Sequence, residues 1–251
     1  VKRGHPLSDK IKGGILTITC IVLFSLPVYI LLEHLSTPLQ IVIGAFILKT
    51  TFSYAYLIEV AKNVKDSLGN IEIARSYLKG LVSRDVSSLD EREVIGATIE
   101  SLAENTCDSI IAPLFYFSIF GVAGAIAYRV VNTADAMIGY KDEKHIDFGY
   151  FSAKLDDLLN FIPARISGAL IAIVGGGFEI MIRDARKTES PNAGWSMSAM
   201  AGSLGIRLEK KGCYVLGEEI EDLTPEKVEE AIKIVKIVSL LGLGIFSAIL
   251  M

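Results

Sequence analysis

The sequence predicts an all-α, polytopic integral membrane protein with about five apolar segments joined by helical polar loops. Two observations lead to this fold class. Hydrophobic residues make up 51% of the 251 residues, the mean hydropathy is +0.46, and the apolar residues are gathered in long blocks. Blocks of about 20 apolar residues are long enough to cross a bilayer. We therefore expect a multi-pass protein of the cell membrane, with the lipid bilayer as its main partner.

Five apolar blocks have this length, at residues 15–32, 39–60, 110–131, 158–182 and 232–251. No small-residue cleavage site follows the first block, so we interpret it as a retained helix and not as a signal peptide. The third block contains Pro113, Gly121 and Gly124, which interrupt helices and predict a kinked or re-entrant element. The fourth contains Arg165, and an ionisable residue in such a block usually faces a site or a partner.

Three polar segments between these blocks are long enough to carry chemistry, at residues 61–109, 132–157 and 183–230. Ser88 and Glu91 have the spacing of a capping box, which predicts a helix from Leu89 to Asp108. We treat residues 1–251 as one membrane domain. Val1 is not an initiator methionine, so the sequence leaves open whether a further helix lies upstream.

Several classes of protein and site are disfavoured. The net charge is −4 and both signs are mixed in every long polar segment, so no basic surface for nucleic acid is expected. The three cysteines and three histidines are scattered, which argues against a disulfide framework and a zinc site. The glycines at 175–177 lack the lysine and the strand of a phosphate loop, and we interpret them as a close helix contact.

Three carboxylates lie four residues apart along the first polar segment: Glu100, Glu104 and Asp108. Residues at this spacing share one helix face, so the three form an acidic stripe and repel one another unless a cation compensates. The stripe is either a solvated helix face or part of a site. Taken alone it favours the solvated face, and the motifs beside it favour the site.

Two pairs of a carboxylate and an amide follow at later block borders. Asn132 and Asp135 share one face if the chain is helical there, and so do Asp156 and Asn160. Mg²⁺ prefers oxygen ligands and is usually held by one or two carboxylates together with substrate phosphates. These pairs therefore predict a magnesium site.

Two arginines are the best candidates for binding an anion. Arg84 lies in the first polar segment and Arg165 inside the fourth apolar block, and a guanidinium binds phosphate through a two-pronged fork of N–H groups. Both have a simpler interpretation as well. Arg165 is equally compatible with a salt bridge to Asp157, and Arg84 with a surface turn that includes Asp85.

Five short motifs follow one another at or near the borders of the apolar blocks: ENT at 104–106, APLF at 112–115, NTAD at 132–135, DDLLNFIPAR at 156–165 and SPNAGW at 190–195. Together with His5-Pro6 and Arg84-Asp85, they resemble the cobalamin biosynthesis proteins of the CobD/CbiB family, also called adenosylcobinamide-phosphate synthases. The resemblance covers about residues 5–217. Ala134, Ala136 and Val86 depart from the family pattern, but no charged candidate is lost.

The resemblance implies an enzyme of cobalamin biosynthesis, a carbon–nitrogen ligase that forms an amide. It would join aminopropanol or its phosphate to a propionate side chain of the corrinoid adenosylcobyric acid, with ATP as co-substrate and Mg²⁺ as cofactor. The product would be cobinamide or cobinamide phosphate. Other late membrane enzymes of the same pathway are possible further partners.

The resemblance also carries roles onto individual residues. We expect Asp135, Asp156 and Glu104 to bind metal, and Arg84 and Arg165 to bind phosphate groups. Asp157 would orient Arg165 or deprotonate the amine. The expected catalytic residues are Glu100, Glu104, Asp108 and Asp157, and the sequence does not choose the general base among Glu100, Asp108 and Asp157. The positioning residues are Asn105, Asn132, Asn160 and Asn192.

Two other functions compete with the enzyme. A membrane signalling or sensor protein of a related regulatory family is the first, and the presence of every charged motif argues against it. A small transporter is the second, with a kinked third block and Arg165 along the substrate path. The long polar segments of this chain fit poorly with a transporter, and the sequence shows no inverted repeat.

Overall fold

The computed structural model describes residues 6–139 and 146–249. His5, which contributes to the family resemblance, lies outside these residues. The chain divides into two compact units, each built from separate stretches of sequence. Unit 1 comprises residues 1–52, 112–160 and 249–251, and unit 2 comprises residues 53–111 and 161–248. The expectation of a single domain over the whole chain stays a prediction.

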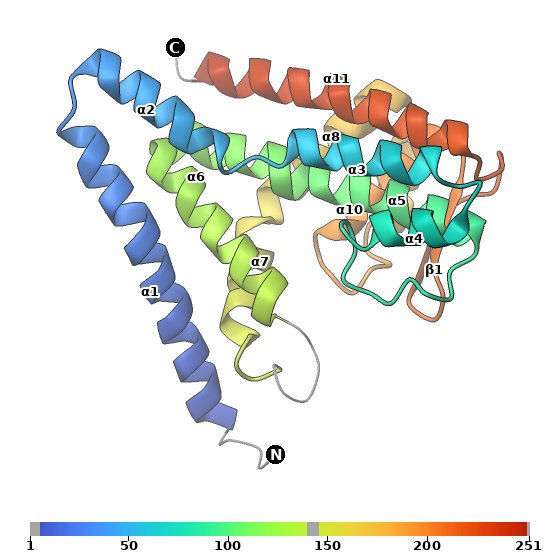
Figure 1. Ribbon diagram of the computed structural model, residues 1–251, viewed down its shortest axis with the longest axis horizontal. Helices are drawn as coiled ribbons and strands as arrows, with labels where there is room; N and C mark the ends of the chain where they lie inside the picture. Colours follow the sequence, from blue (N-terminus) through green and yellow to red (C-terminus); the bar gives the residue numbers. More distant parts are fainter. Residues whose placement is uncertain (1–5, 140–145, 250–251) are drawn as a thin grey trace. The chain divides into compact units, whose positions relative to one another are not determined.

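The described elements are almost all helical, as predicted (Figure 1). In chain order they are α1 (Pro6–Glu33), α2 (Thr37–Lys49), α3 (Tyr54–Asp66), α4 (Ile71–Leu78), α5 (Glu91–Thr106), the π-helix η1 (Cys107–Ile111), α6 (Ala112–Ile138), α7 (Tyr150–Leu159), α8 (Phe161–Gly175), α9 (Phe178–Asp184), α10 (Ala193–Leu204), β1 (Arg207–Lys210), β2 (Tyr214–Gly217) and α11 (Pro225–Ile249).

The polytopic membrane fold is confirmed by the length and composition of these helices. Within the described residues, four stretches are long and apolar enough to cross a membrane: Leu7–Glu33, Thr37–Asp66, Glu91–Ile138 and Pro225–Ile249. A fifth span results if Tyr150–Leu159 and Phe161–Gly175 are counted as one broken span. The predicted number of about five is therefore met, although the helices extend well beyond the apolar blocks.

Unit 1 is built around α1, which packs along both α6 and α7 (Figure 1). Glycine allows this close approach. A Cβ atom on Gly13 would lie 1.8 Å from the carbonyl oxygen of Phe148, and one on Gly14 would meet the Phe151 ring. Without a strong hydrophobic effect between helices in lipid, small residues give the close van der Waals contact that holds them together. This packing fixes α7 beside α6, which both carry predicted site residues.

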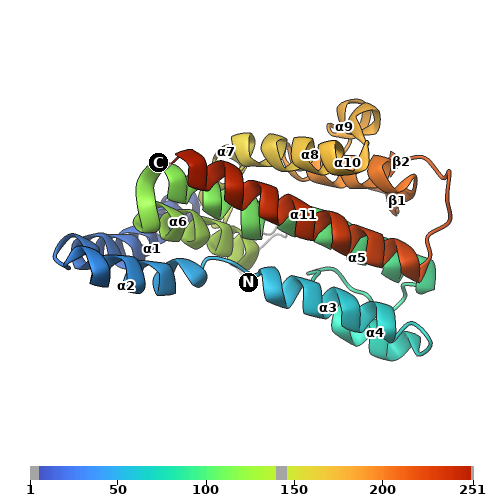
Figure 2. The ribbon, with the colours of Figure 1, turned by 90° about the horizontal axis from the view of Figure 1, so that it is seen from above.

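Unit 2 is organised by α10, which packs against α8, α9 and α5; α8 and α10 run side by side in Figure 2. A Cβ atom on Gly175 would lie 2.2 Å from the Cβ of Ser203. One on Gly177 would lie 2.3 Å from the carbonyl oxygen of Ala199. The glycines at 175–177 therefore serve close packing, as their sequence context indicated, and do not form a phosphate loop.

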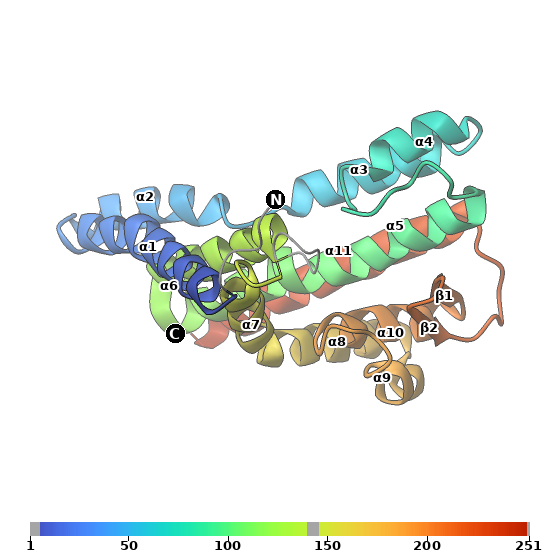
Figure 3. The ribbon, with the colours of Figure 1, turned by 90° about the horizontal axis from the view of Figure 1, so that it is seen from below.

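A β-hairpin follows α10, and the sequence analysis did not predict it (Figure 3). β1 and β2 pair antiparallel, with Lys210 opposite Tyr214 and Gly212 in the turn at a φ of +74°. Leu208 and Leu216 are fully buried, so alternation between polar and apolar residues holds the hairpin against α10 and α5. Each strand has only four residues, too short for a clear pattern.

A buried carboxylate ties α9 to this hairpin. Asp184 is fully buried, and its Oδ2 accepts a hydrogen bond from the backbone N–H of Gly217 at 2.8 Å. Arg183 and Lys187 also form ion pairs with it, at 2.8 and 2.5 Å. Burial disfavours the charged form, but these hydrogen bonds outweigh it and hold the pKa of Asp184 well below its usual range.

The predicted interruption of the third apolar block is confirmed. Gly121 breaks the regular helix within α6, with φ of 65° and ψ of −162°. Glycine is the residue that adopts such angles without steric strain. The π-helix η1 comes just before Pro113, a proline position early in α6 where its missing N–H is tolerated.

The helix predicted over residues 89–108 forms as α5, but its predicted cap is wrong. Asp90, and not Ser88, is the N-cap, and its side chain accepts a hydrogen bond from the Glu93 backbone at 2.8 Å. The Glu93 carboxylate accepts from the Asp90 backbone at 2.9 Å. Both pairs have capping-box spacing, but Asp90 has the extended backbone that the cap requires, with ψ of 177°.

Candidate functional site

Unit 1 brings four predicted residues together in what we call the carboxylate–amide cluster: Asn132 and Asp135 of α6, Asp156 of α7, and Asn160, the C-cap of α7. Asp156 is the centre. Its Oδ1 accepts from Nδ2 of Asn132 at 3.2 Å, and its Oδ2 accepts from Nδ2 of Asn160 at 3.0 Å. Two amides thus hold one carboxylate in a fixed orientation.

Residues that the sequence analysis did not select fix the orientation of the two amides. The Tyr128 hydroxyl donates to Oδ1 of Asn160 at 2.9 Å, and Nη1 of Arg129 donates to Oδ1 of Asn132 at 3.1 Å. Tyr128 is buried, and its ring stacks on Tyr116 with centroids 5.1 Å apart. Because each amide oxygen accepts from a neighbour, each amide nitrogen must point at Asp156. The helical spacing of three residues from Arg129 to Asn132 is the signal that could have identified Arg129, whereas Tyr128 reaches Asn160 across 32 residues and had no such signal.

Asp135 is the carboxylate of the cluster that is not committed to a partner. Among the residues that the structure describes, it has no hydrogen bond and no ion pair, and Asp156 and Asp157 act on it electrostatically. Its position depends on Gly139, because a Cβ atom there would lie 1.9 Å from Asp135 Oδ1. Adjacent carboxylates repel, so a cation is needed for all of them to be charged.

The cluster fits a magnesium ion. Asp135 and Asp156 offer carboxylate oxygens, and the amide oxygens of Asn132 and Asn160 each accept a hydrogen bond from a neighbouring side chain. Two carboxylates completed by waters and substrate phosphates are a usual set for Mg²⁺. In the described part of the chain, no group of three or more His, Cys, Asp or Glu residues is arranged to hold a metal ion. Asp135 and Asp156 would therefore need water or substrate oxygens as further ligands.

Asp157 and Glu104 are two further predicted residues, and neither takes part in the hydrogen bonds of Asp156 described above. Asp157 forms an ion pair with Lys154 at 3.1 Å, one turn back along α7. Glu104, predicted as a third metal ligand, is exposed on α5 in unit 2, whereas Asp135 and Asp156 belong to unit 1. The metal set that the geometry supports within one unit is therefore Asp135 and Asp156.

Unit 2 places Arg84 and Glu100 in contact. Nη2 of Arg84, in the loop before α5, lies 2.9 Å from Oε2 of Glu100. Glu100 is buried, with only 6% of its surface exposed, so it does not lie on a solvated helix face. Its Oε1 and the Arg84 Nε are buried without a hydrogen-bond partner among the described residues. Two groups that lack partners in a buried ion pair indicate a site that is completed by something else.

The hairpin adds Tyr214 to this pair. Burial raises the pKa of the Tyr214 hydroxyl, and the nearby carboxylates of Glu100 and Glu104 raise it further. The hydroxyl therefore stays protonated and can act as a hydrogen-bond donor. Tyr214 was missed because the hairpin that carries it was missed.

Two other residues of the predicted set belong to the end of α5 and to the π-helix. Asn105 donates from Nδ2 to the carbonyl oxygen of Ser101 at 3.0 Å, and its Oδ1 accepts from Ser109 at 3.2 Å. Asp108 lies inside η1, where the chain no longer follows α-helical spacing. The acidic stripe predicted for Glu100, Glu104 and Asp108 is therefore not continuous.

Arg165 and Asn192 are also brought together in unit 2. Nη1 of Arg165 in α8 donates to Oδ1 of Asn192 at 3.2 Å and to the carbonyl oxygen of Phe161 at 2.5 Å. Asn192 is the N-cap of α10 and is buried. The SPNAGW string is thus a turn into a helix, as its local sequence suggested, and it also positions an arginine.

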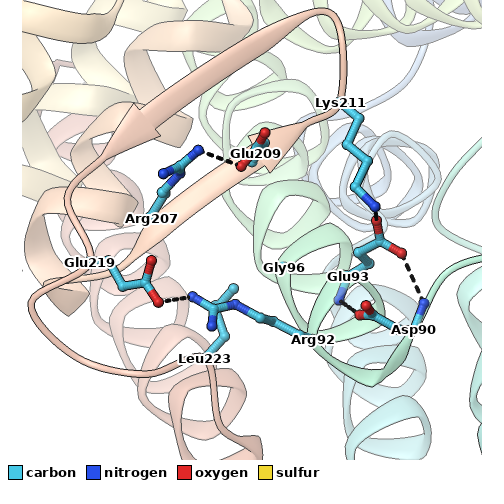
Figure 4. Close-up of a pocket in the computed structure, with 9 residues that line it drawn as sticks. All are labelled: Asp90, Arg92, Glu93, Gly96, Arg207, Glu209, Lys211, Glu219 and Leu223. Carbon is cyan, nitrogen blue, oxygen red and sulfur yellow. Dashed lines mark hydrogen bonds and ion pairs between the residues drawn. The ribbon is translucent and has the colours of Figure 1, made fainter.

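A charged pocket of about 260 Å³ lies where the N-terminal turn of α5 faces the hairpin (Figure 4). Its charged side chains are already paired. Arg207 pairs with Glu209, Lys211 with Glu93 and Arg92 with Glu219, while Asp90 caps α5. Because these groups neutralise one another, the pocket is a weaker candidate for a substrate anion than the arginines described above.

Comparisons with known proteins decide the family. The model of the family described as CobD/Cbib protein matches residues 2–241. The chain belongs to this family. It is 46% identical to the probable cobalamin biosynthesis protein CobD of Methanothermobacter thermautotrophicus, over 90% of this chain and 79% of that protein. It is 42% identical to the cobalamin biosynthesis protein CobD of Dehalococcoides mccartyi, over 87% of this chain and 75% of the relative.

A third relative, the probable cobalamin biosynthesis protein CobD of Thermoplasma volcanium, is 40% identical over 92% of this chain and 79% of its own length. The names of these related proteins support a role in cobalamin biosynthesis, in agreement with the motifs. No solved structure matches the chain.

Proposed function

We propose that this protein is an amide-forming ligase of cobalamin biosynthesis. It joins the amine of aminopropanol, or of its phosphate, to a propionate carboxylate of adenosylcobyric acid with ATP as co-substrate. The observation that supports this best is the carboxylate–amide cluster, because it sits in a CobD/Cbib protein and offers one carboxylate held by two amides beside a second, uncommitted carboxylate. Cobinamide or cobinamide phosphate is the product.

The chemistry has two requirements that the residues can meet. A carboxylate is a poor acyl donor, so its oxygen attacks the terminal phosphorus of ATP, ADP leaves, and an acyl phosphate forms. The amine nitrogen then attacks the acyl carbon, phosphate leaves, and the amine's proton passes to a base. Both steps concentrate negative charge on phosphate oxygens, which positively charged groups must stabilise.

Each group of residues has a place in this scheme. Asp135 and Asp156 hold Mg²⁺, which when bound neutralises charge on the transferring phosphoryl group. Asn132 and Asn160 hold the carboxylate of Asp156 in one orientation. Arg84 and Arg165 bind phosphate groups, since guanidinium forks match phosphate oxygens.

The base is drawn from the remaining carboxylates. Glu100 is buried beside Arg84 and Tyr214, whereas the partly exposed Asp157 pairs with the exposed Lys154. A base must reach the ammonium within hydrogen-bond distance, and a buried carboxylate is the one whose affinity for a proton is easily adjusted. We therefore favour Glu100 over Asp157, Asp108 and Glu104.

Mass spectrometry of a reconstituted reaction tests the proposal. Purified full-length protein is incubated with adenosylcobyric acid, ATP, Mg²⁺ and either aminopropanol phosphate or free aminopropanol. We expect the amide product from the wild type and at least a 100-fold loss in Asp135→Asn, with the fold retained by circular dichroism. A folded wild type that forms no amide with either amine would overturn the proposal and favour the sensor function.

A further inference from the structure

We propose that Arg165 and Arg186 together form a binding site for a phosphate group, with the Trp195 ring as its wall. Neither Arg186 nor Trp195 has a role in the function proposed above. The inference rests on that function only for the identity of the phosphate compound. The geometry of the site stands on contacts within unit 2.

Arg165 is held in one orientation before any ligand binds. Its guanidinium carbon lies 3.6 Å from the centroid of the Phe161 ring and 4.8 Å from that of the Trp195 ring. Its Nη1 is tied to the Phe161 carbonyl and to Asn192. Aromatic contacts and a fixed Nη1 reduce the conformational freedom that would otherwise be lost on binding.

The other edge of the same guanidinium is available. Both hydrogen bonds of Arg165 use Nη1, and its Nε and Nη2 have no acceptor in residues 6–139 or 146–249. This Nε–Nη2 edge is the two-pronged donor that binds a phosphate through two parallel hydrogen bonds. The ring stacking orients it, so it behaves as a prepared site and not as a mobile surface side chain.

Arg186 places a second positive charge at the same site. It lies in the turn after α9 with an exposed side chain, directly after Ala185, whose carbonyl oxygen would lie 2.1 Å from a Cβ atom on Gly194, the residue before Trp195. Its charge acts on Arg165. Its neighbours are neutralised: Arg183 pairs with Asp184 and Glu218, and Lys187 with Asp184. Arg186 itself has no ion pair among the described residues. Two like charges near each other without a counterion are unfavourable, and a bound anion removes that repulsion.

The chemistry selects a phosphate over a carboxylate. Two guanidinium groups supply two positive charges, which match the charge of a phosphate monoester near pH 7 better than a single carboxylate charge. Trp195 also has its Nε1 buried without a hydrogen-bond partner in the described part of the chain, so an additional acceptor oxygen would be stabilising. Aminopropanol phosphate and the polyphosphate of ATP share this chemistry.

Trp195 makes the test direct, because it is the single tryptophan of the chain. Its fluorescence is recorded while the full-length protein in detergent is titrated with inorganic phosphate, aminopropanol phosphate and ATP. We expect a saturable change in the wild type. Arg186→Gln should weaken binding about 10-fold, and Arg165→Gln should abolish it. Arg207→Gln, in an arginine paired with Glu209, is the matched control and should bind as the wild type does.

Comparing the affinities of the three probes identifies the compound that the site binds. Tighter binding of aminopropanol phosphate assigns the site to the amine substrate, and tighter binding of ATP assigns it to the nucleotide. Unchanged affinity in Arg186→Gln, or no saturable response to any of the three probes together with no binding by equilibrium dialysis, would overturn the inference. No corrinoid or turnover is needed, so phosphate binding without amide formation would refute only the proposed reaction.

Discussion

Asn132 of α6 donates a hydrogen bond of 3.2 Å to Asp156 of α7 and thereby joins two motifs that are 24 residues apart. The carboxylate is caught between this amide and that of Asn160. The oxygen of each asparagine accepts a hydrogen bond in turn, from Arg129 in Asn132 and from Tyr128 in Asn160. The two asparagines are therefore positioning residues for a carboxylate.

Replacing the carboxylate by an amide tests this arrangement. In Asp156→Asn, an NH₂ group faces the NH₂ of either Asn132 or Asn160, so one hydrogen bond is lost together with a metal-binding charge. We expect amide formation to fall by at least 100-fold and the apparent Mg²⁺ requirement to rise, measured by product formation across a Mg²⁺ series. Asp147→Asn, in the partly exposed partner of Lys10, should leave both unchanged. Equal losses in both variants would contradict the role of Asp156.

Gly139 is expected to be essential for the position of Asp135. A methyl group there would lie 1.9 Å from the Asp135 carboxylate and 2.7 Å from its backbone oxygen. Gly139→Ala should therefore reduce amide formation nearly as much as Asp135→Asn does, as measured by the same mass-spectrometric assay. Gly69→Ala is the control, since nothing lies within 4 Å of that position. Full activity in Gly139→Ala would show that the carboxylate works from another position.

The Arg84–Glu100 pair should be asymmetric in its effect on stability. Arg84→Met leaves the Glu100 carboxylate buried without its counter-charge, which costs about 3–5 kcal/mol. Glu100→Gln removes the buried charge itself and should cost less, and the double variant should recover part of the loss. Thermal unfolding of the four proteins in detergent measures these differences. If Glu100→Gln were the more harmful single change, the pair would not be dominated by the burial of Glu100.

Asp184 is expected to make stability depend on acidic pH. Its pKa in the folded protein lies below the ordinary value of 3.8, so the unfolded chain takes up its proton first as pH falls. The stabilisation is fully present above that value and is lost as pH falls toward the pKa of the folded state. Asp184→Asn should lower the free energy of unfolding at pH 7 by about 2 kcal/mol, because hydrogen bonds to a buried charge are lost.

This pH dependence is followed through the midpoint temperature of thermal unfolding, measured at several pH values between pH 6 and pH 3. The wild type should lose more stability over this range than Asp184→Asn does. Glu219→Gln is a useful comparison: the hydrogen bond from Arg92 also lowers the pKa of Glu219, but this carboxylate is exposed. It should have little effect, since exposed pairs contribute little. A parallel pH dependence in wild type and Asp184→Asn would exclude Asp184 as the source.

The sequence predicted the helices and their interruptions well, because hydrophobic blocks, proline and glycine act locally. Gly121, which breaks a helix, and the glycines at 175–177, which allow close packing, are examples in which the missing side chain was the signal. The cap of α5 was misplaced because Ser88–Glu91 and Asp90–Glu93 have the same spacing, and only the backbone angles distinguish them. The hairpin was missed because its strands are short and depend on burial against α5 and α10.

The candidate residues were easier to name than their roles. Asp156 with Asn160 follows from helical spacing, whereas Tyr128 and Tyr214 contribute through contacts between distant segments. The alternative pairing of Arg165 with Asp157 was open in the sequence. The structure gives Arg165 an asparagine and two aromatic rings, and gives Asp157 a lysine. Such choices depend on tertiary geometry, which spacing alone does not contain.

The glycine contact between α8 and α10 has a consequence for work with the purified protein. Its attraction comes from backbone surfaces in close contact and not from the removal of apolar side chains from water. Replacing lipid by detergent therefore changes little of what holds these two helices together. Arg165 is on one of them and Asn192 caps the other, so their geometry should survive extraction from the membrane even where contacts that depend on lipid do not.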